Sequence, residues 1–358
     1  MGLVMATRKR PTPRNHATRK PGTKQSQKKT GKTSLGSIPV AAPSNLSYEE
    51  AVIKHILQSS PQVHKVPREA LIFGSLMSNM SPAMSEMYYK SGMQVGRALY
   101  RVNAEQKDYI IPEESIEDLV KFFELIGYRN VTYSAYQDSK ISIEFHEPKS
   151  SQHLGSRMHV FESGIISGYL TAAKGQLVNV AESSCTGSDG DACRFVEAPA
   201  ASHGSASVNS LDELAEMVKQ RSMSEQIGQT EIASEYQSLL YTPVLDVAYS
   251  DYMKQIASYL GNSVGSRIAS SLPKGNGKAR MQSIEQAIRT LNMGTPMVRS
   301  MKPLDIRIKF DELASRQGFV DISLSFINGL LSSSMVGKAT ATESIQNGHY
   351  TVDIKGSK

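Results

Sequence analysis

The chain lacks the features of a secreted or membrane-spanning protein. It contains no run of about 18 or more apolar residues, which a transmembrane helix would need. Its first residues, MGLVMATRKRP, include basic side chains where a signal peptide needs an uninterrupted apolar segment. The hydrophobic content of 39% is still enough for a globular protein to bury a core. We therefore expect a cytoplasmic protein without a transmembrane segment.

Acidic residues are missing from residues 1–48, although the chain has 34 of them. The same segment holds ten of the 40 Lys and Arg residues, so the rest of the chain has 30 basic against 34 acidic residues. Residues 1–46 have almost no large apolar side chains to offset the entropy of ordering, and we expect a disordered basic tail. The tail either only solubilises the protein or docks on an anionic partner, such as RNA, DNA or acidic lipid. Its cations are Arg8, Lys9, Arg10, Arg14, Arg19, Lys20, Lys24, Lys28, Lys29 and Lys32.

Cysteine is scarce, because only Cys185 and Cys193 occur. A small-loop disulfide would suit a secreted chain, whereas a metal site or free thiols suit a chain without a signal peptide. The two cysteines belong to the pattern Glu182-x2-Cys185-x7-Cys193, and His159 precedes it. A carboxylate, two thiolates and an imidazole suit tetrahedral Zn(II), and glycines let the short loop bring both sulfurs together. Because four protein ligands leave no position for water, the pattern predicts a structural zinc site.

The hydrophobic pattern predicts helices followed by a hairpin, then a helix and two further strands. Ser47-Tyr48-Glu49-Glu50 has the spacing of a capping box and should begin the first helix. Helices are expected within 69–101, broken at Ser81-Pro82, and over 115–127; strands over 131–136 and 141–145; a helix over 158–173; and strands over 177–180 and 194–196. This order favours an α/β (α+β) fold with an antiparallel sheet and packed helices.

The second part of the chain repeats the order of the first. Residues 259–268 echo 89–98, residues 283–285 echo 115–117, and residues 304–310 echo 140–145. We therefore predict two tandem copies that pair like a dimer. The expected domains are a tail (1–46), a zinc domain (47–197), a linker and connecting helix (198–235) and a degenerate second copy (236–358).

In the second copy the ligand positions should fall near residues that cannot assemble a zinc site. With Gly190 aligned to Gly348, these positions are Gln317, Thr340, Glu343 and Thr351. Only the first copy is therefore expected to hold metal.

The segment from Met158 to Phe195 resembles the terminal signature of the 4-vinyl-reductase domain family. That signature is a helix with a Gly-x3-Gly step (Gly164 and Gly168), a strand ending in Glu-x2-Cys, a Gly-Asp turn and Cys-x-Phe. The resemblance is strong over about 40 residues and plausible back to Glu69. It implies an α+β fold related to vesicle-tethering subunits, dimers in many members, and roles in binding small apolar or aromatic molecules or in tetrapyrrole metabolism. In phenol-sensing bacterial regulators of the family, zinc is bound by the Glu, both Cys and a further Cys just before the helix, where this chain has His159.

Two non-enzymatic functions remain open. The first is a small-molecule sensor or carrier, and the second is an adaptor that joins a protein complex, or a homodimer, through its dimer-like surface while the tail docks on an anionic partner. An enzyme is the weakest hypothesis, because the sequence has neither a nucleophile-elbow serine nor a nicotinamide fingerprint. Glu117 and Glu162 are expected to be solvated helix residues. The pocket of a carrier would be lined by Met87, Tyr88, Val95, Leu99, Ile165 and Tyr169.

Overall fold

The structure is a computed structural model of the chain, and its described part begins at residue 47. It describes residues 47–58, 65–79, 81–105, 107, 115–136, 140–146, 159–186, 190–199, 208–223, 231–240, 250–272, 277–301, 303–310, 317–332, 339–346 and 349–356. These residues belong to one compact unit, Pro43–Lys358. The predicted basic tail, with its ten cations, lies outside the described residues.

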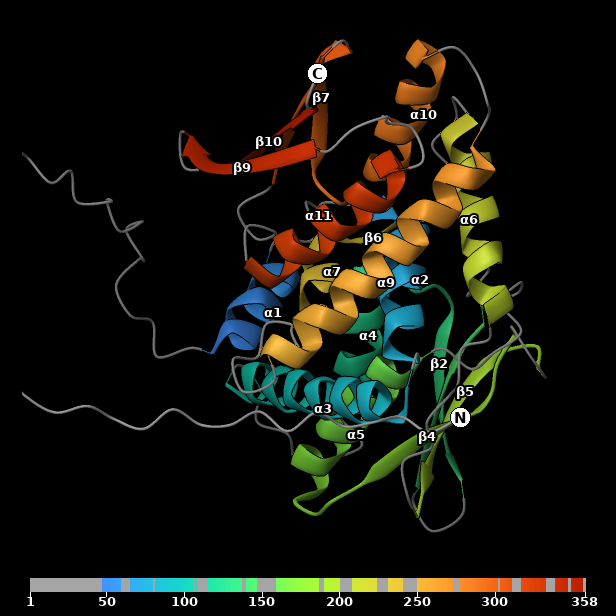
Figure 1. The fold of residues 1–358 in the computed structure, drawn as a ribbon. Helices are drawn as coiled ribbons and strands as arrows, with labels where there is room; N and C mark the ends of the chain where they lie inside the picture. Colours follow the sequence, from blue (N-terminus) through green and yellow to red (C-terminus); the bar gives the residue numbers. More distant parts are fainter. Residues whose placement is uncertain are drawn as a thin grey trace, which may run out of the picture. The chain divides into compact units, whose positions relative to one another are not determined.

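The first half of this unit contains helices and an antiparallel sheet (Figure 1). The sheet has four strands in the order β2-β3-β5-β4. The predicted fold class, an antiparallel sheet with packed helices, is confirmed. The predicted capping box is also present, since Ser47 N–H donates to Glu50 and Glu50 N–H donates to the Ser47 hydroxyl. The elements are α1 (Tyr48–Gln58), β1 (Lys65–Pro67), α2 (Arg68–Ser78), α3 (Pro82–Ala104), α4 (Ile116–Ile126), β2 (Val131–Tyr136), β3 (Lys140–Phe145), α5 (Val160–Lys174), β4 (Asn179–Ser184) and β5 (Cys193–Ala198).

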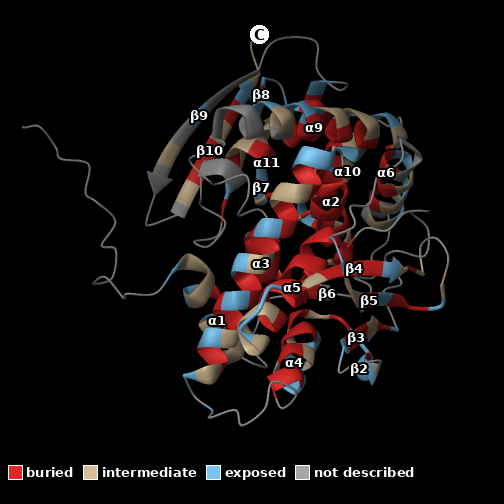
Figure 2. Cartoon of the chain, turned by 90° about the horizontal axis from the view of Figure 1, so that it is seen from below, coloured by how far each residue is buried: buried red, intermediate tan, exposed pale blue. Residues whose placement is uncertain are grey.

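Helices α3 and α5 pack with their backbones in close contact. A Cβ atom added to Gly96 would lie 2.0 Å from the carbonyl oxygen of Ile165, and one added to Gly168 would lie 2.1 Å from that of Met93. Because any larger side chain would meet backbone atoms, glycine is required at this crossing. The approach fixes α5 on the core side, where its residues from Val160 to Leu170 are buried (Figure 2).

The second half has the same order of elements. Its sheet is antiparallel, with the strand order β7-β8-β10-β9, which matches β2-β3-β5-β4 strand for strand. The elements are α6 (Val208–Met223), β6 (Glu231–Ala233), α7 (Ser234–Leu240), α9 (Ser250–Ser271), α10 (Gly277–Thr290), β7 (Thr295–Met301), β8 (Leu304–Lys309), α11 (Gln317–Ser332), β9 (Ala339–Gln346) and β10 (His349–Gly356).

The crossing of α9 and α11 repeats that of α3 and α5 residue by residue. A Cβ atom on Gly265 would meet the Phe326 carbonyl oxygen at 2.1 Å and the Leu330 backbone nitrogen, just as one on Gly96 meets the same backbone atoms of Ile165 and Tyr169. Ile165 and Phe326 therefore occupy equivalent positions in the two halves. Counting back along each helix makes Glu162 equivalent to Ser323 and His159 equivalent to Val320.

The contacts between the halves are reciprocal. Strands β1 and β6 pair antiparallel, with Val66 opposite Ile232 at the centre, and each leads directly into a helix, α2 or α7. Helix α1 packs on α3 and α4 of its own half and on α7, whereas α6 packs on α9 and α10 of its own half and on α2. This reciprocity is the pattern of a two-fold related pair. It also extends the second half back to α6, into the segment predicted to be linker and connecting helix (198–235). Origin of the halves by duplication stays a prediction.

Candidate metal centre

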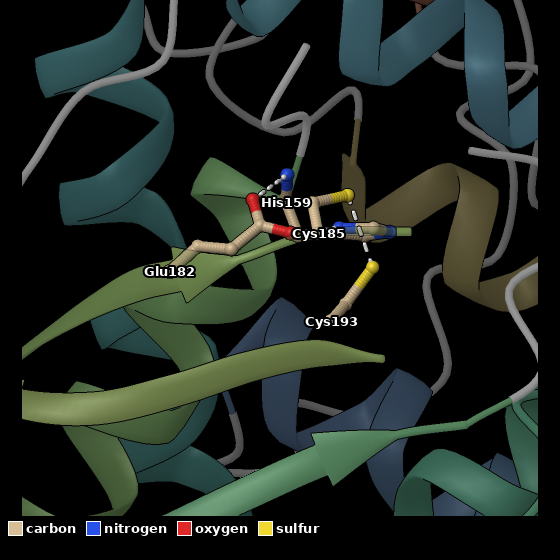
Figure 3. Close-up of side chains that lie close together, drawn as sticks. All are labelled: His159, Glu182, Cys185 and Cys193. Atoms are coloured by element: carbon tan, nitrogen blue, oxygen red, sulfur yellow. Dashed lines mark hydrogen bonds and ion pairs between the residues drawn. The ribbon is translucent and has the colours of Figure 1, made fainter. Parts of the chain in front are cut away.

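The four predicted zinc ligands lie together in the first half (Figure 3). His159 directly precedes α5, Glu182 lies in β4, Cys185 follows β4, and Cys193 begins β5. One potential ligand atom from each lies within 4.8 Å of the others. In the part of the chain that the structure describes, this is the only such group of His, Cys, Asp and Glu residues. The structure therefore places the residues where they could hold a metal ion.

The hairpin between β4 and β5 brings the two cysteines together. The register of these strands shifts between Glu182 and Ser184, which is the signature of a β-bulge that re-aims side chains. Past the bulge, the Gly190 N–H donates to the Cys185 carbonyl oxygen over 3.0 Å. The Ser184 hydroxyl donates to the Ala192 carbonyl oxygen over 3.2 Å. These bonds hold both ends of the connection, so the sulfur atoms of Cys185 and Cys193 lie 3.0 Å apart.

The carboxylate of Glu182 links β4 to the start of α5. Its Oε2 accepts the backbone N–H of His159 over 3.1 Å, and its Oε1 lies 2.7 Å from His159 Nδ1. The carboxylate thus satisfies a donor at the positive end of the helix while it orients the imidazole ring. Both side chains are buried, with exposed fractions of 4% for His159 and 5% for Glu182.

The electrostatics of these groups favour a charged pair of His159 and Glu182 beside a neutral Cys185 thiol when no metal is bound. Burial opposes the imidazolium, but the Glu182 carboxylate and the Cys185 hydrogen bond outweigh it and raise the pKa of His159 well above its usual range. Burial likewise opposes ionisation of Glu182, but His159 lowers the pKa of that carboxyl. The hydrogen bond with Cys193, followed by burial, raises the pKa of the Cys185 thiol. A metal ion that takes these ligands must therefore displace protons.

The donor set fits a tetrahedral metal ion. With metal–ligand bonds of about 2.0–2.3 Å, neighbouring ligand atoms of a tetrahedral zinc site lie roughly 3.3–3.8 Å apart. The observed separations, from the 2.7 Å of the His159–Glu182 contact to the 4.8 Å limit of the group, bracket this range. Small side-chain rotations can therefore bring the four atoms to one ion. The rings of Tyr128, Phe145 and Phe195 pack edge-on around His159, with centroids 5.9–6.3 Å from it.

The disulfide that the sequence left open is not formed. Both cysteines are buried, and the 3.0 Å between their sulfur atoms is longer than an S–S bond of about 2.05 Å.

Glu162 corrects one expectation from the sequence. It was expected to be a solvated helix residue, but it has an exposed fraction of 0% and accepts hydrogen bonds from the hydroxyls of Tyr128 and Tyr236. The sequence contains a signal that could have shown this, since Glu162 interrupts the otherwise apolar and small-residue stretch from Val160 to Leu170. Glu117, expected to behave in the same way, is indeed exposed.

The residues proposed to line a ligand pocket pack in the core. Five of the six have exposed fractions of 0%, and the sixth, Met87, packs against them partly buried. The five are Tyr88, Val95, Leu99, Ile165 and Tyr169. None borders either of the two cavities described in the structure. One, of about 510 Å³, lies between α6 and α9, and the other, of about 340 Å³, lies beside the α5–β4 connection.

The strand register revises the ligand positions expected in the second half. Cys193 lies opposite Phe145 in the first half. In the second half the carbonyl oxygen of Tyr350 accepts the N–H of Phe310, so Tyr350 occupies the position of Cys193. Glu182 lies opposite Phe195, as Glu343 lies opposite Val352. The equivalents of His159, Glu182 and Cys193 are thus Val320, Glu343 and Tyr350, instead of Gln317, Thr340 and Thr351.

Val320 is an apolar core residue with an exposed fraction of 0%. It therefore cannot replace the imidazole. Among the described residues, the second half has no equivalent of the four-donor set.

No helix among the described residues is both long enough and apolar enough to cross a membrane. Comparisons of the chain with protein-family models, with curated proteins and with solved structures gave no match. The resemblance to the 4-vinyl-reductase domain family therefore stays a prediction carried by residues 158–195.

Proposed function

We propose that the first half binds one structural Zn(II) ion and that the chain acts as a non-enzymatic adaptor. The observation that carries this proposal is the burial of four suitable donors, from the start of α5, the end of β4 and the start of β5, at one point in the core. Two cysteine thiolates select against Mg²⁺ and Ca²⁺, which prefer oxygen ligands, and favour zinc. When four protein side chains fill a tetrahedral shell, no position remains for a reacting water.

A metal ion bound here would join segments that are far apart in sequence. It would fix the β4–β5 connection to α5, and α5 is the helix that packs on α3 through glycines. Because the ligands would not form a site in the unfolded chain, the free energy of metal binding adds to the free energy of folding. The metal would thus hold the first half in shape for binding at its surface.

An adaptor is favoured over a small-molecule carrier because the proposed pocket residues are occupied by packing. Tyr88 and Tyr169 make edge-on contacts with Phe161 and Tyr100, with ring centroids 6.5 and 5.4 Å apart. A ligand would have to displace these contacts. We propose that the partner binds the paired halves, and that the basic tail adds attraction to an anionic partner.

Native mass spectrometry of the full chain tests this proposal, because it reports metal, retained small molecules and subunit number together. We expect a mass increment of one zinc ion per chain and no organic ligand, and we expect Cys193→Ser to lose the zinc. Ser183→Ala, an exposed position in the neighbouring strand β4, is the matched control and should keep it. A retained apolar molecule would favour the carrier instead, and absence of zinc from the native protein would refute the metal site.

A further inference from the structure

A buried acid lies one helical turn beyond the metal centre. Glu162 has an exposed fraction of 0%, and its Oε1 accepts the Tyr128 hydroxyl over 2.7 Å and the Tyr236 hydroxyl over 3.0 Å. Its second oxygen, Oε2, is buried without a hydrogen-bond partner among the described residues. We call Glu162, Tyr128 and Tyr236 the Glu162 cluster. A carboxyl group in such a place is costly to bury, so the fold must compensate for it.

The cluster joins the two halves of the chain. Glu162 lies on α5 and Tyr128 follows α4, whereas Tyr236 lies on α7 of the second half. The Tyr236 ring packs against Phe161 at 5.9 Å and against Phe122 and Tyr128 at 6.4 Å. The second half therefore supplies one of the two hydroxyls that hold the acid.

The positions that correspond to Glu162, Tyr128 and Tyr236 by the two-fold relation have no ionisable side chain. Glu162 corresponds to Ser323, as shown by the helix crossings. Tyr128 corresponds to Met293, because each follows the end of its helix and donates its N–H to the carbonyl five residues back. Tyr236, the third residue of α7, corresponds to Ala70, the third residue of α2.

In this neutral version, the Ser323 hydroxyl contacts the Met293 sulfur at 3.2 Å. Helix α11, in the half without the four-donor set, thus also lacks a buried acid at the position of Glu162. The polar cluster is not a general requirement of the fold, and it occurs where the ligand set occurs.

A short path connects the cluster to a metal ligand. His159 directly precedes α5 and Glu162 lies in the first turn of that helix, where the Ser163 N–H donates to the His159 carbonyl oxygen over 2.9 Å. The Tyr128 ring, held by Glu162, packs edge-on against the His159 ring at 6.3 Å. Loss of a hydroxyl from the cluster would loosen both supports of the imidazole.

We infer that Glu162 and Tyr236 are positioning residues for the metal centre, so that the second half regulates how tightly the first half holds its zinc. The inference rests on the proposed zinc site. Partners that support a metal ligand from outside its coordination shell typically change metal affinity by about 10- to 100-fold. Coupling of this kind is reciprocal, so zinc must also strengthen the docking of α7.

The test is the zinc affinity of the full-length Tyr236→Phe variant, measured by competition with a chromophoric chelator. Tyr88→Phe is the matched control: Tyr88 is also fully buried and packs on Phe161, but its hydroxyl has no hydrogen-bond partner among the described residues. We expect Tyr236→Phe to bind zinc about 10-fold more weakly than the wild type. Tyr88→Phe should bind zinc as the wild type does.

A second readout separates positioning from a merely structural role. A structural role lowers the melting temperatures of the zinc-loaded and zinc-free proteins equally, whereas a positioning role reduces the rise in melting temperature that zinc produces. Glu162→Gln, which keeps the size of the side chain, gives the same test if Tyr236→Phe does not fold. Wild-type affinity in both variants would overturn the inference while leaving the zinc site intact. Failure of the wild type itself to bind zinc would overturn both.

Discussion

Substitution of Gly96 by alanine tests the helix crossing on which the first half is built. The added Cβ would lie 2.0 Å from the Ile165 carbonyl oxygen, roughly 1.5 Å short of an ordinary contact. The obstacle is backbone, which cannot rotate away, so the cost should lie at the upper end of overpacking, about 3 kcal/mol. Alanine recovers about 1 kcal/mol of helix propensity relative to glycine. We therefore expect a net loss of about 2 kcal/mol.

Differential scanning calorimetry of the zinc-loaded protein measures this effect. The unit Pro43–Lys358 is larger than the domains of about 150–250 residues that shift by roughly 2–4 °C per kcal/mol, so a loss of about 2 kcal/mol should lower its melting temperature by roughly 3 °C. Gly265→Ala should cost a similar amount, because its Cβ would meet the Phe326 carbonyl oxygen at 2.1 Å. Gln94→Ala, on the exposed face of α3, is the control and should change the melting temperature little. An unchanged or raised melting temperature for Gly96→Ala would refute the close approach of α3 and α5.

Further predictions concern the metal ligands and the tail. Zinc affinity should fall by on the order of 100-fold per pH unit as the pH is lowered from about 8 to about 6, because the raised pKa values of His159 and Cys185 mean that zinc must displace at least two protons. Isothermal titration at several pH values measures this, and a zinc affinity that does not change with pH would contradict it. His159→Cys should retain one zinc per chain, whereas His159→Ala should lose more zinc affinity than the about 10- to 100-fold typical of a residue that only supports a ligand. If chelator competition gave His159→Ala the affinity of the wild type, His159 would not be a ligand. Deletion of residues 1–46 should leave the melting temperature nearly unchanged but weaken binding to RNA, DNA or acidic vesicles, and binding by the full chain should depend steeply on salt. If filter or vesicle assays show that the deletion leaves binding unchanged and that binding is insensitive to salt, the tail only solubilises the protein.

Much of the metal centre could be predicted because its chemistry is local. Glu182, Cys185 and Cys193 lie within 12 residues, and few arrangements other than a metal site use such a spacing. His159 lies 23 residues before Glu182, and its inclusion depended on its place directly before a helix. The helices and strands of both halves also follow from hydrophobic periodicity, which reflects burial on one face.

The contacts between the halves could not be predicted in this way. Strands β1 and β6 have three residues each and are separated by more than 160 positions, so neither carries a recognisable pattern. Tyr236 lies at the predicted boundary between the connecting helix and the second copy, and nothing in its surroundings indicates that its hydroxyl reaches α5. Glu162 was misjudged because a single acid at a helix start more often faces solvent or the helix dipole. The ligand positions of the second half were shifted because an alignment through one glycine does not fix strand register.

The most direct test of the account is X-ray absorption spectroscopy at the zinc edge on the purified full-length protein. We expect one zinc ion per chain, coordinated by two sulfur atoms at about 2.3 Å and two nitrogen or oxygen atoms at about 2.0–2.1 Å. In Cys193→Ser the zinc-bound sulfur signal should be lost with the metal. A shell of oxygen atoms without sulfur would contradict the account.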